Sequence, residues 1–480
     1  MGRSSHRLVW LVATILVACG PIAPSTPSAS RAASTARTSA QASAAPSIDP
    51  SLVGAASGHD PLLPTLGNGG YDAESYDIAI ETNPVNNQTT LRVVIDSVAS
   101  QRLGRFSLDY SGIAPGSVRV DDTAAAFTEA GGKLTVTPSR VINAGGTFRT
   151  AVDIAGRPNA VRGVGWAWRG AEQLSSFGTY DVLPTWIPTN DDPADKALIE
   201  THITVPRPYT AVGPGLLVSK TDTAGGRAFD WHAGPSSQFS IVVRDYQTAD
   251  LGTVAGVPLT SYEPKDLPPR QREALNRIPT IFEYLSEIYG PFPFDSLNLV
   301  WVDGLSDMEG PDEGLLKWGP QRLEPTALAH HLTHIWFMVN VTPRTSHESY
   351  LRAAFANYGD LLWIEHTEGV EARDELMAAM HADLGATTEA PADPSRIAGN
   401  NALFIRGPLS LHALRVIVGD ETFFEVLRTW VVRFHRQAAS VDDFVAHSEH
   451  VSGRSLDDWQ QRWLLDQAVP PISELALGSG

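Results

Sequence analysis

The stretch Ala329-His330-His331-Leu332-Thr333-His334-Ile335-Trp336-Phe337 decides how the second half of this 480-residue chain is interpreted. It reads as an apolar helix that carries His330 and His334 four residues apart. Positions i and i+4 lie on one face of a helix, so the two imidazoles could share one zinc ion. A zinc site needs three or four ligands, however, and packed histidines also have this spacing. The spacing alone leaves both interpretations open.

Composition bounds the class of protein. The chain is long enough for two or three ordinary domains, and its 42% hydrophobic residues can fill real cores. Its 54 acidic residues outnumber its 36 Lys and Arg residues, which gives a net charge of −18. Nucleic-acid binding requires a basic surface, so we expect no nucleic-acid partner.

The N-terminus has the pattern of an export signal. A basic head precedes an apolar run, Leu8 to Ala18, that is too short to span a membrane, so residues 1–18 read as a signal peptide. The run ends in Leu16-Val17-Ala18-Cys19-Gly20, which resembles a bacterial lipobox, where the chain is cut before the cysteine and the thiol is lipidated. We expect Cys19 to anchor the mature protein extracytoplasmically on the bacterial cell membrane. The alternative is a stray cysteine beside a signal cut elsewhere.

The rest of the chain divides into three parts. Residues 19–60 are rich in Ala, Ser, Thr and Pro, which predicts a disordered tether. Residues 61–250 contain short alternating runs with glycine turns between them, typical of an antiparallel β-sandwich. From Pro268 the periodicity becomes helical, so residues 251–472 read as a mainly helical domain with one small sheet. The predicted fold class is therefore multidomain α+β.

Six segments, in chain order, resemble the aminopeptidase N family of zinc peptidases, the gluzincins. They are Gly67 to Tyr71 with Tyr76-Asp77, Trp186 to Lys196, Gly290 to Phe294, Asp307 to Gly310, His330 to Phe337, and Val341 to Pro343. The resemblance covers nearly all of residues 61–470. It implies an N-terminal β-saddle domain followed by a thermolysin-like peptidase domain.

The family's functional positions fall on residues that depart from its pattern. Its two histidine ligands match His330 and His334, but its third ligand, a glutamate, falls on Ala353. Its catalytic glutamate, the second letter of H-E-x-x-H, falls on His331, and its oxyanion-stabilising tyrosine on Phe404. The glutamate that reads the free amine of the substrate matches Glu309.

These substitutions predict impaired chemistry. Losing a general base costs about 10²–10⁴ in rate, and losing an oxyanion donor about 10²–10³. Alanine cannot bind a metal, so zinc is a possible cofactor only if another residue replaces the third ligand. The flanking residues His347, Glu348 and Asp360 are the candidates, although each also fits a solvated or capping role.

Three functions remain open. The first is a lipid-anchored pseudopeptidase that binds peptide N-termini or an envelope protein partner. The second is an active zinc-dependent aminopeptidase with unusual ligands, which a family name alone would favour. The third is a structural envelope lipoprotein without a peptide-binding cleft. Hydrolysis of aminoacyl amides with and without chelator separates the first two.

Overall fold

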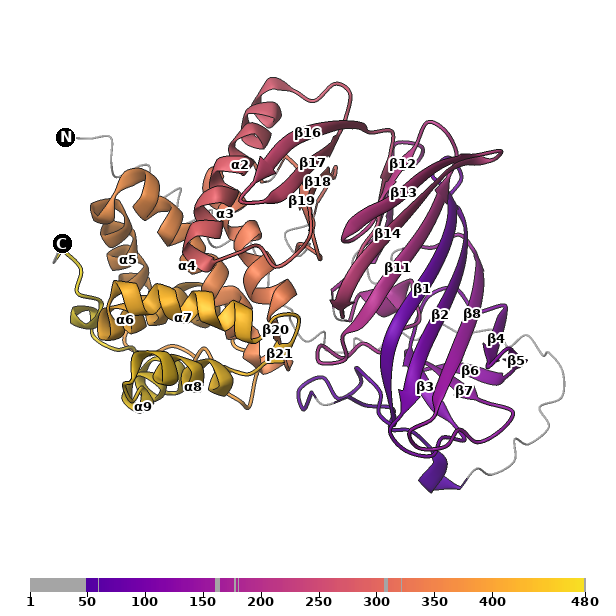
Figure 1. The fold of residues 1–480 in the computed structure, drawn as a ribbon. Coiled ribbons are helices and arrows are strands. Elements are labelled where there is room, and N and C mark those ends of the chain that lie inside the picture. Colours follow the sequence, from indigo (N-terminus) through magenta and orange to yellow (C-terminus); the bar gives the residue numbers. More distant parts are fainter. Residues whose placement is uncertain are drawn as a thin grey trace, which may run out of the picture.

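The structure is a computed structural model that describes residues 49–58, 60–159, 165–176, 178–179, 181–305, 310–320 and 322–478. Its β-rich region and its helical region lie side by side, with a small sheet between them (Figure 1). The predicted signal peptide, Cys19, most of the predicted tether and Glu309 lie outside the described residues. Among those described, we find no helix with the length and apolar character that crossing a membrane requires.

The β-rich region is built on one eight-stranded sheet. In spatial order its strands are β13 (Leu216–Thr223), β14 (Gly226–Ser236), β11 (Ala197–Val205), β1 (Tyr71–Asn83), β2 (Gln88–Ala99), β8 (Thr147–Gly156), β4 (Ser117–Val120) and β5 (Thr123–Ala124). The strands alternate between buried and exposed residues, as in β1, so one face packs on the core while the other meets solvent. β1 and β11 run parallel, unlike the antiparallel pairing expected from the sequence.

Two smaller sheets complete this region. One contains β12 (Thr210–Val212), β15 (Val242–Arg244), β10 (Gln173–Ser176) and β9 (Trp166–Trp168). The other contains β3 (Phe106–Asp109), β7 (Lys133–Thr137) and β6 (Ala126–Ala130). The segment Trp186 to Lys196 is a packed loop: Trp186 is buried, and the side chain of Asp192 accepts a hydrogen bond from the Ala194 N–H in an Asx turn.

Order begins before the predicted end of the tether at residue 60. The 3₁₀ helix η1 (Pro50–Leu52) is followed by Gly54, whose N–H donates to the carbonyl of Arg105. Asp60 accepts a hydrogen bond of 2.6 Å from the Ser346 N–H, so this arm contacts the helical region. The arm's small residues thus pack through backbone hydrogen bonds and one carboxylate rather than through apolar side chains.

A mixed sheet and a set of helices form the second region. The sheet order is β16 (Gln247–Val254), β17 (Val257–Glu263), β18 (Leu297–Trp301) and β19 (Leu315–Trp318). The helices are α2 (Pro269–Tyr289), α3 (Pro325–His334), η3 (Ile335–Asn340), η4 (Ser346–Ser349), α4 (Tyr350–Glu368), α5 (Val370–Leu384), η5 (Asn401–Arg406), α6 (Gly407–Val418), α7 (Asp420–Arg433), α8 (Val441–Ser452), α9 (Asp457–Trp459) and η6 (Gln460–Leu465). Short elements η2 (Leu183–Thr185), η7 (Ile472–Leu475), β20 (Thr342–Pro343) and β21 (Ala438–Ala439) complete the description.

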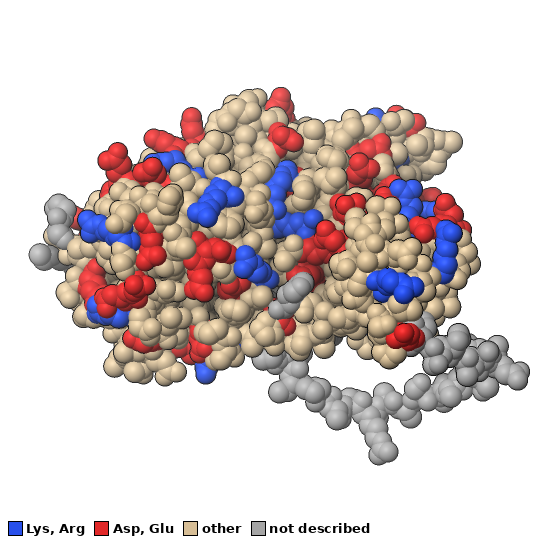
Figure 2. Space-filling view, turned by 60° about the horizontal axis from the view of Figure 1, so that its bottom comes forward, with Lys and Arg blue, Asp and Glu red and all other residues tan. Residues whose placement is uncertain are grey.

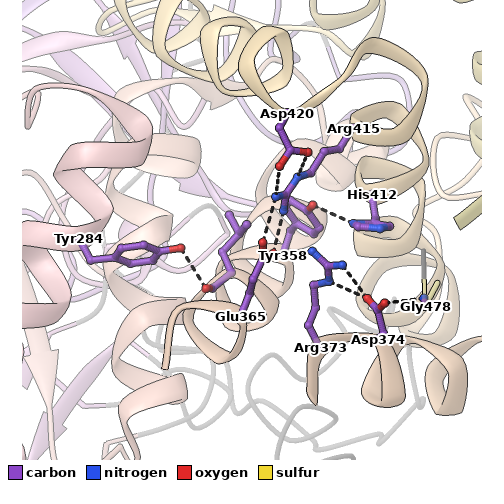
Figure 3. A network of polar contacts seen from close by, with 10 residues as sticks. Tyr284, Tyr358, Glu365, Arg373, Asp374, His412, Arg415, Asp420 and Gly478 are labelled. Atoms are coloured by element: carbon purple, nitrogen blue, oxygen red, sulfur yellow. Dashed lines mark hydrogen bonds and ion pairs between the residues drawn. The ribbon is translucent and has the colours of Figure 1, made fainter. Parts of the chain in front are cut away.

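A largely buried polar network links the four helices α4, α5, α6 and α7 (Figure 3). Glu365 accepts from Arg415 at 2.8 Å and from Arg373 at 2.7 Å, and Arg415 also pairs with Asp420 at 2.7 Å. Burial opposes ionisation of Glu365, but these guanidinium groups hold its pKa below its ordinary value. Since isolated buried charges are costly, the network fixes how α5, α6 and α7 pack relative to α4.

Candidate functional site

The candidate site lies where α3 packs on α4. α3 begins with Pro325, which fits the first turn of a helix because it lacks an N–H. It carries His330, His331 and His334, whose side chains are all buried. The helices approach closely at Gly359 of α4, where an added Cβ would lie 2.4 Å from Oγ1 of Thr333. This close contact holds the histidine-bearing face of α3 rigidly against α4.

The three histidines form one cluster. The ring centroids of His330 and His334 are 4.8 Å apart, and those of His330 and His331 are 5.1 Å apart. One ring nitrogen from each histidine lies within 4.8 Å of the others. His331, expected from the sequence only as a replaced base, therefore also offers a third nitrogen to the cluster.

Asp360 orients the first histidine of the cluster. Its Oδ2 lies 3.1 Å from Nδ1 of His330, and both side chains are buried. Burial raises the pKa of Asp360, while His330 acts in the opposite direction. A carboxylate on one ring nitrogen fixes the orientation of the imidazole and leaves the other nitrogen available. Asp360 thus contacts a histidine of the cluster from the second helix.

The surroundings favour neutral histidines. Burial lowers the pKa of His331 well below its ordinary value, and Arg322 and the neighbouring histidines add to this effect. Burial likewise lowers the pKa of His334, with His330, Arg352 and Arg322 contributing. Burial therefore favours the neutral form of His331 and His334, which is the form of imidazole that binds metal. The charges of Arg322 and Arg352 oppose an additional cation, and the Asp360 side chain beside His330 acts in the other direction.

The family's third-ligand and oxyanion positions offer no side-chain oxygen. Ala353, at the third-ligand position, lies buried on α4, and Phe404, at the oxyanion position, lies buried in η5. An added Cβ on Gly407 would lie 2.9 Å from Cβ of Ala354, so the segment after η5 packs directly on α4. Both positions are thus filled by apolar side chains inside the packed helical core.

The other candidate ligands have structural roles. Glu348 accepts from the N–H and the hydroxyl of Thr345, both at 3.0 Å, and closes a capping box at η4. His347 lies 3.0 Å, through Nδ1, from the Thr345 hydroxyl. Of the three, Asp360 is the one that contacts the histidine cluster.

A small cavity of about 80 Å³ has Arg352, whose charge acts on His334, in its lining. Its lining combines the arm residue Asp60, the loop residues Asp191 and Asp192, and Met338 and Arg352 from the helical region. Burial, together with Asp109, raises the pKa of Asp191 well above its ordinary value. The cavity therefore lies between the β-rich region and the helical region and is lined by both acidic and basic side chains.

The types and number of the candidate ligand residues fit a zinc ion. Three imidazoles are an accepted ligand set for a catalytic zinc, with the fourth position left for water or substrate. His330, His331 and His334 match that set in type and number, and Asp360 supports one of them. A zinc ion held there would act as a Lewis acid. The chain itself would contribute the ligands. It would contribute neither the family's carboxylate base nor its oxyanion donor, because those positions carry His331 and Phe404.

Sequence reasoning missed several features of this site. Arg322 and Arg352 lie outside the motif at residues 329–337, and only the folded structure places their charges near the histidines. A second group of candidate ligands, Asp77, Glu200 and His202, comes from two strands far apart in the sequence. The exposed, alternating positions of these three residues are the only hint the sequence offers.

Comparison with known proteins shows which proteins the chain is similar to. Residues 321–463 match the model of the peptidase family M1 domain. Human glutamyl aminopeptidase is 21% identical over 341 residues, which cover 63% of this chain and 35% of that protein. Human aminopeptidase O is 25% identical over 287 residues, which cover 50% of this chain and 35% of that protein. The chain thus spans about a third of the length of the curated relatives it matches.

A solved structure covers more of the fold. The M1 zinc metallopeptidase from Deinococcus radiodurans superposes with a TM-score of 0.75 at 24% sequence identity. The match covers 86% of this chain and 98% of that one. The resemblance to the aminopeptidase N-like family is confirmed, as is the predicted α+β fold of a β-rich domain followed by a helical domain. The family is one of zinc metallopeptidases, and the chain contains a histidine cluster that could hold zinc.

Proposed function

We propose that this protein is a catalytically impaired member of the M1 metallopeptidase fold that binds peptide N-termini or an envelope protein partner. The observation that carries the proposal is the chemistry of the buried site. His331, Ala353 and Phe404 stand where a peptidase of this fold needs a base, a ligand and an oxyanion donor. Burial and the charge of Arg322 lower the pKa of His331, so the residue at the base position is a neutral imidazole instead of a carboxylate.

Hydrolysis of aminoacyl reporter amides tests the loss of catalysis. The full chain is assayed after incubation with zinc, with and without chelator, beside His330→Ala. We expect turnover no higher than that of His330→Ala under every condition. Chelator-sensitive turnover that disappears in His330→Ala would overturn the proposal.

Peptide binding tests the retained role. A fluorescent peptide with a free amine and the same peptide with an acetylated N-terminus are titrated into the full chain. We expect the free amine to bind at least tenfold more tightly, and Glu309→Gln to remove the difference. Equal affinity for both peptides would contradict capture of an N-terminus and favour a structural envelope role.

A second candidate function is zinc-dependent aminopeptidase activity with His330, His331 and His334 as the ligands. The observation that favours it is the placement of three ring nitrogens within 4.8 Å of one another. This function predicts one zinc ion at the α3 cluster and chelator-sensitive turnover, both lost in His330→Ala and His331→Ala.

We also propose that a lipid on Cys19 holds the protein on the outer side of the bacterial membrane. The support is the apolar run that ends at a lipobox-like Leu16 to Gly20. The full chain should remain with the membrane fraction, whereas Cys19→Ala should be released. An unchanged distribution of Cys19→Ala would show that the anchor lies elsewhere.

Acidic and basic side chains are intermixed over the face shown in Figure 2, which supports the expectation that nucleic acid is not the partner.

A further inference from the structure

The solvent-facing side of the eight-stranded sheet carries a second histidine cluster. Asp77 on β1 lies opposite Glu200 on β11 in the parallel pair. On the other side of β11, Glu200 lies opposite His232 and His202 opposite Asp230 in the antiparallel pair with β14. Side chains of adjacent strands that point to one face are close neighbours. The sheet therefore places acidic and imidazole groups of three strands side by side.

The potential donor atoms of this cluster are already close together. One atom each from Asp77, Glu200 and His202 lies within 4.8 Å of the others. Nε2 of His202 lies 3.5 Å from Oδ1 of Asp77. At 2.1 Å from a metal, two ligand atoms at right angles are about 3 Å apart. Small side-chain rotations would bring the three atoms to that spacing, and exposed side chains are free to make them.

Asp230 holds the histidine in a suitable orientation. Its Oδ1 lies 2.8 Å from Nδ1 of His202, which leaves Nε2 directed toward Asp77. Asp230 also accepts a hydrogen bond from the Ser219 hydroxyl on β13. A carboxylate behind an imidazole is the arrangement that supports histidine ligands in metal sites.

Access and charge also fit a cation. The side chains of His202 and Asp77 are 44% and 55% exposed. A shallow hollow of the sheet borders His202, with Ala79, Thr204 and Arg92 in its lining, so water can reach the cluster. Three carboxylates, those of Asp77, Glu200 and Asp230, surround His202, and Arg92 is the cation in the lining of the hollow. A divalent cation would therefore meet carboxylate ligands at a position that water can also reach.

We propose that Asp77, Glu200 and His202 form a binding site for a divalent first-row metal ion, with zinc as the reference ion, and that Asp230 positions His202. Imidazole together with carboxylate selects such ions over magnesium and calcium, which prefer oxygen ligands. Three protein ligands leave further coordination positions for water. The competing explanation is a set of cross-strand ion pairs that binds no metal.

Zinc titration of the full chain by equilibrium dialysis tests the site. The variants are His202→Ala and Asp77→Asn, with His330→Ala to report on the buried cluster. Asp96→Asn is the matched control, because Asp96 is a carboxylate on the same sheet that pairs with Arg149 instead of a histidine. Thermal unfolding of each variant verifies the fold, and cobalt absorption reports whether a nitrogen ligand is present.

We expect His202→Ala and Asp77→Asn each to weaken zinc binding at this site at least tenfold. Asp96→Asn and His330→Ala should leave that binding event unchanged. The absence of zinc binding in the wild type, or unchanged binding in His202→Ala, would overturn the proposal. An equal loss in Asp96→Asn would also overturn it, since binding would then follow surface charge alone. None of these results depends on peptidase activity or on peptide binding.

Discussion

The histidine cluster on α3 and the histidine cluster on the sheet differ in almost everything except the spacing of their nitrogen and oxygen atoms. The first is buried, contains three imidazoles with Asp360 against one of them, and lies near Arg322 and Arg352. The second is exposed and surrounds His202 with Asp77, Glu200 and Asp230. The distances between donor atoms alone would identify both as metal sites. Charge and solvation separate them, because water and three carboxylates can compensate a cation on the sheet, whereas the buried cluster has two arginine charges beside it as well as Asp360.

Adding the missing carboxylate to the buried cluster should produce the largest change. Ala353→Glu places a negative ligand at the position that resembles the family's third ligand. We expect zinc affinity at that cluster to rise at least about a hundredfold, since loss of an outer-shell partner alone costs 10–100-fold. Competition with a chromogenic chelator measures the affinity, and Ala353→Gln is the neutral control. An equal gain in Ala353→Gln would show that charge is not what the buried cluster lacks.

The rigidity of the buried cluster can be broken at the contact between α3 and α4. In Gly359→Ala the new methyl would lie 2.4 Å from Oγ1 of Thr333, so the helices must separate. We expect a loss of about 2 kcal/mol in the free energy of unfolding, measured by urea denaturation. Gly225→Ala is the control, because no heavy atom lies within 4 Å of an added Cβ there. A stable Gly359→Ala variant would mean that the helix pair tolerates expansion.

The exclusion of charge from buried histidines should appear as pH dependence. Burial, with Arg373 and Arg415 nearby, lowers the pKa of His412 to about 4, and Nδ1 of His412 lies 3.1 Å from the Tyr358 hydroxyl (Figure 3). Between pH 4 and the ordinary value of 6.5, the unfolded chain binds more protons at this position than the folded chain. The stability that neutral His412 contributes is therefore present above pH 6.5 and decreases as the pH falls.

Comparison with His412→Asn isolates this contribution from the other titrating groups. The difference in unfolding free energy between wild type and variant should shrink by about 1 kcal/mol between pH 7 and 5.5. Urea denaturation at both pH values measures it. A constant difference would show that His412 accepts a proton in the folded state as readily as in the unfolded state.

The smallest effect is expected at the exposed cluster without metal. His202→Ala removes a half-exposed side chain, and surface substitutions usually change stability by less than about 0.5 kcal/mol. Thermal unfolding in the presence of chelator measures the change. A much larger loss would indicate that the cross-strand pairs of His202 stabilise the sheet by themselves, which would weaken the contrast between the clusters.

The local features of the fold follow from the sequence to a large extent. The apolar stretch 329–337 is helical, in α3 and η3, and Gly290 ends α2 with a positive φ of 91°. Its apolar residues Trp336 and Phe337 lie in the core, where the Phe337 ring stacks on Phe355 at 4.6 Å. The helices α5 and α8 have a weaker sequence signal, because their apolar positions are sparse among charged and small residues.

Features that depend on distant residues could not be predicted. The third nitrogen of the buried cluster depends on how α3 rotates against α4, and its charge environment on where Arg322 and Arg352 fold. The exposed cluster depends on the parallel pairing of β1 with β11, strands that many residues separate. Local propensity carries no information on such pairings, whereas the motif at His330 to Phe337 lies within a single helix.

The parallel pair of β1 and β11 also bears on how the chain reaches its folded state. Pairing strands so distant in sequence closes a long loop, and the entropy of that closure must be offset before other contacts form. The single cysteine, Cys19, rules out an intrachain disulfide as a covalent brace. A metal ion bound by Asp77 and Glu200 would be a reversible cross-link between β1 and β11, and it could form only when the two strands are in register. Metal in the surroundings would then slow unfolding of the sheet, so that the lifetime of the folded domain follows metal supply.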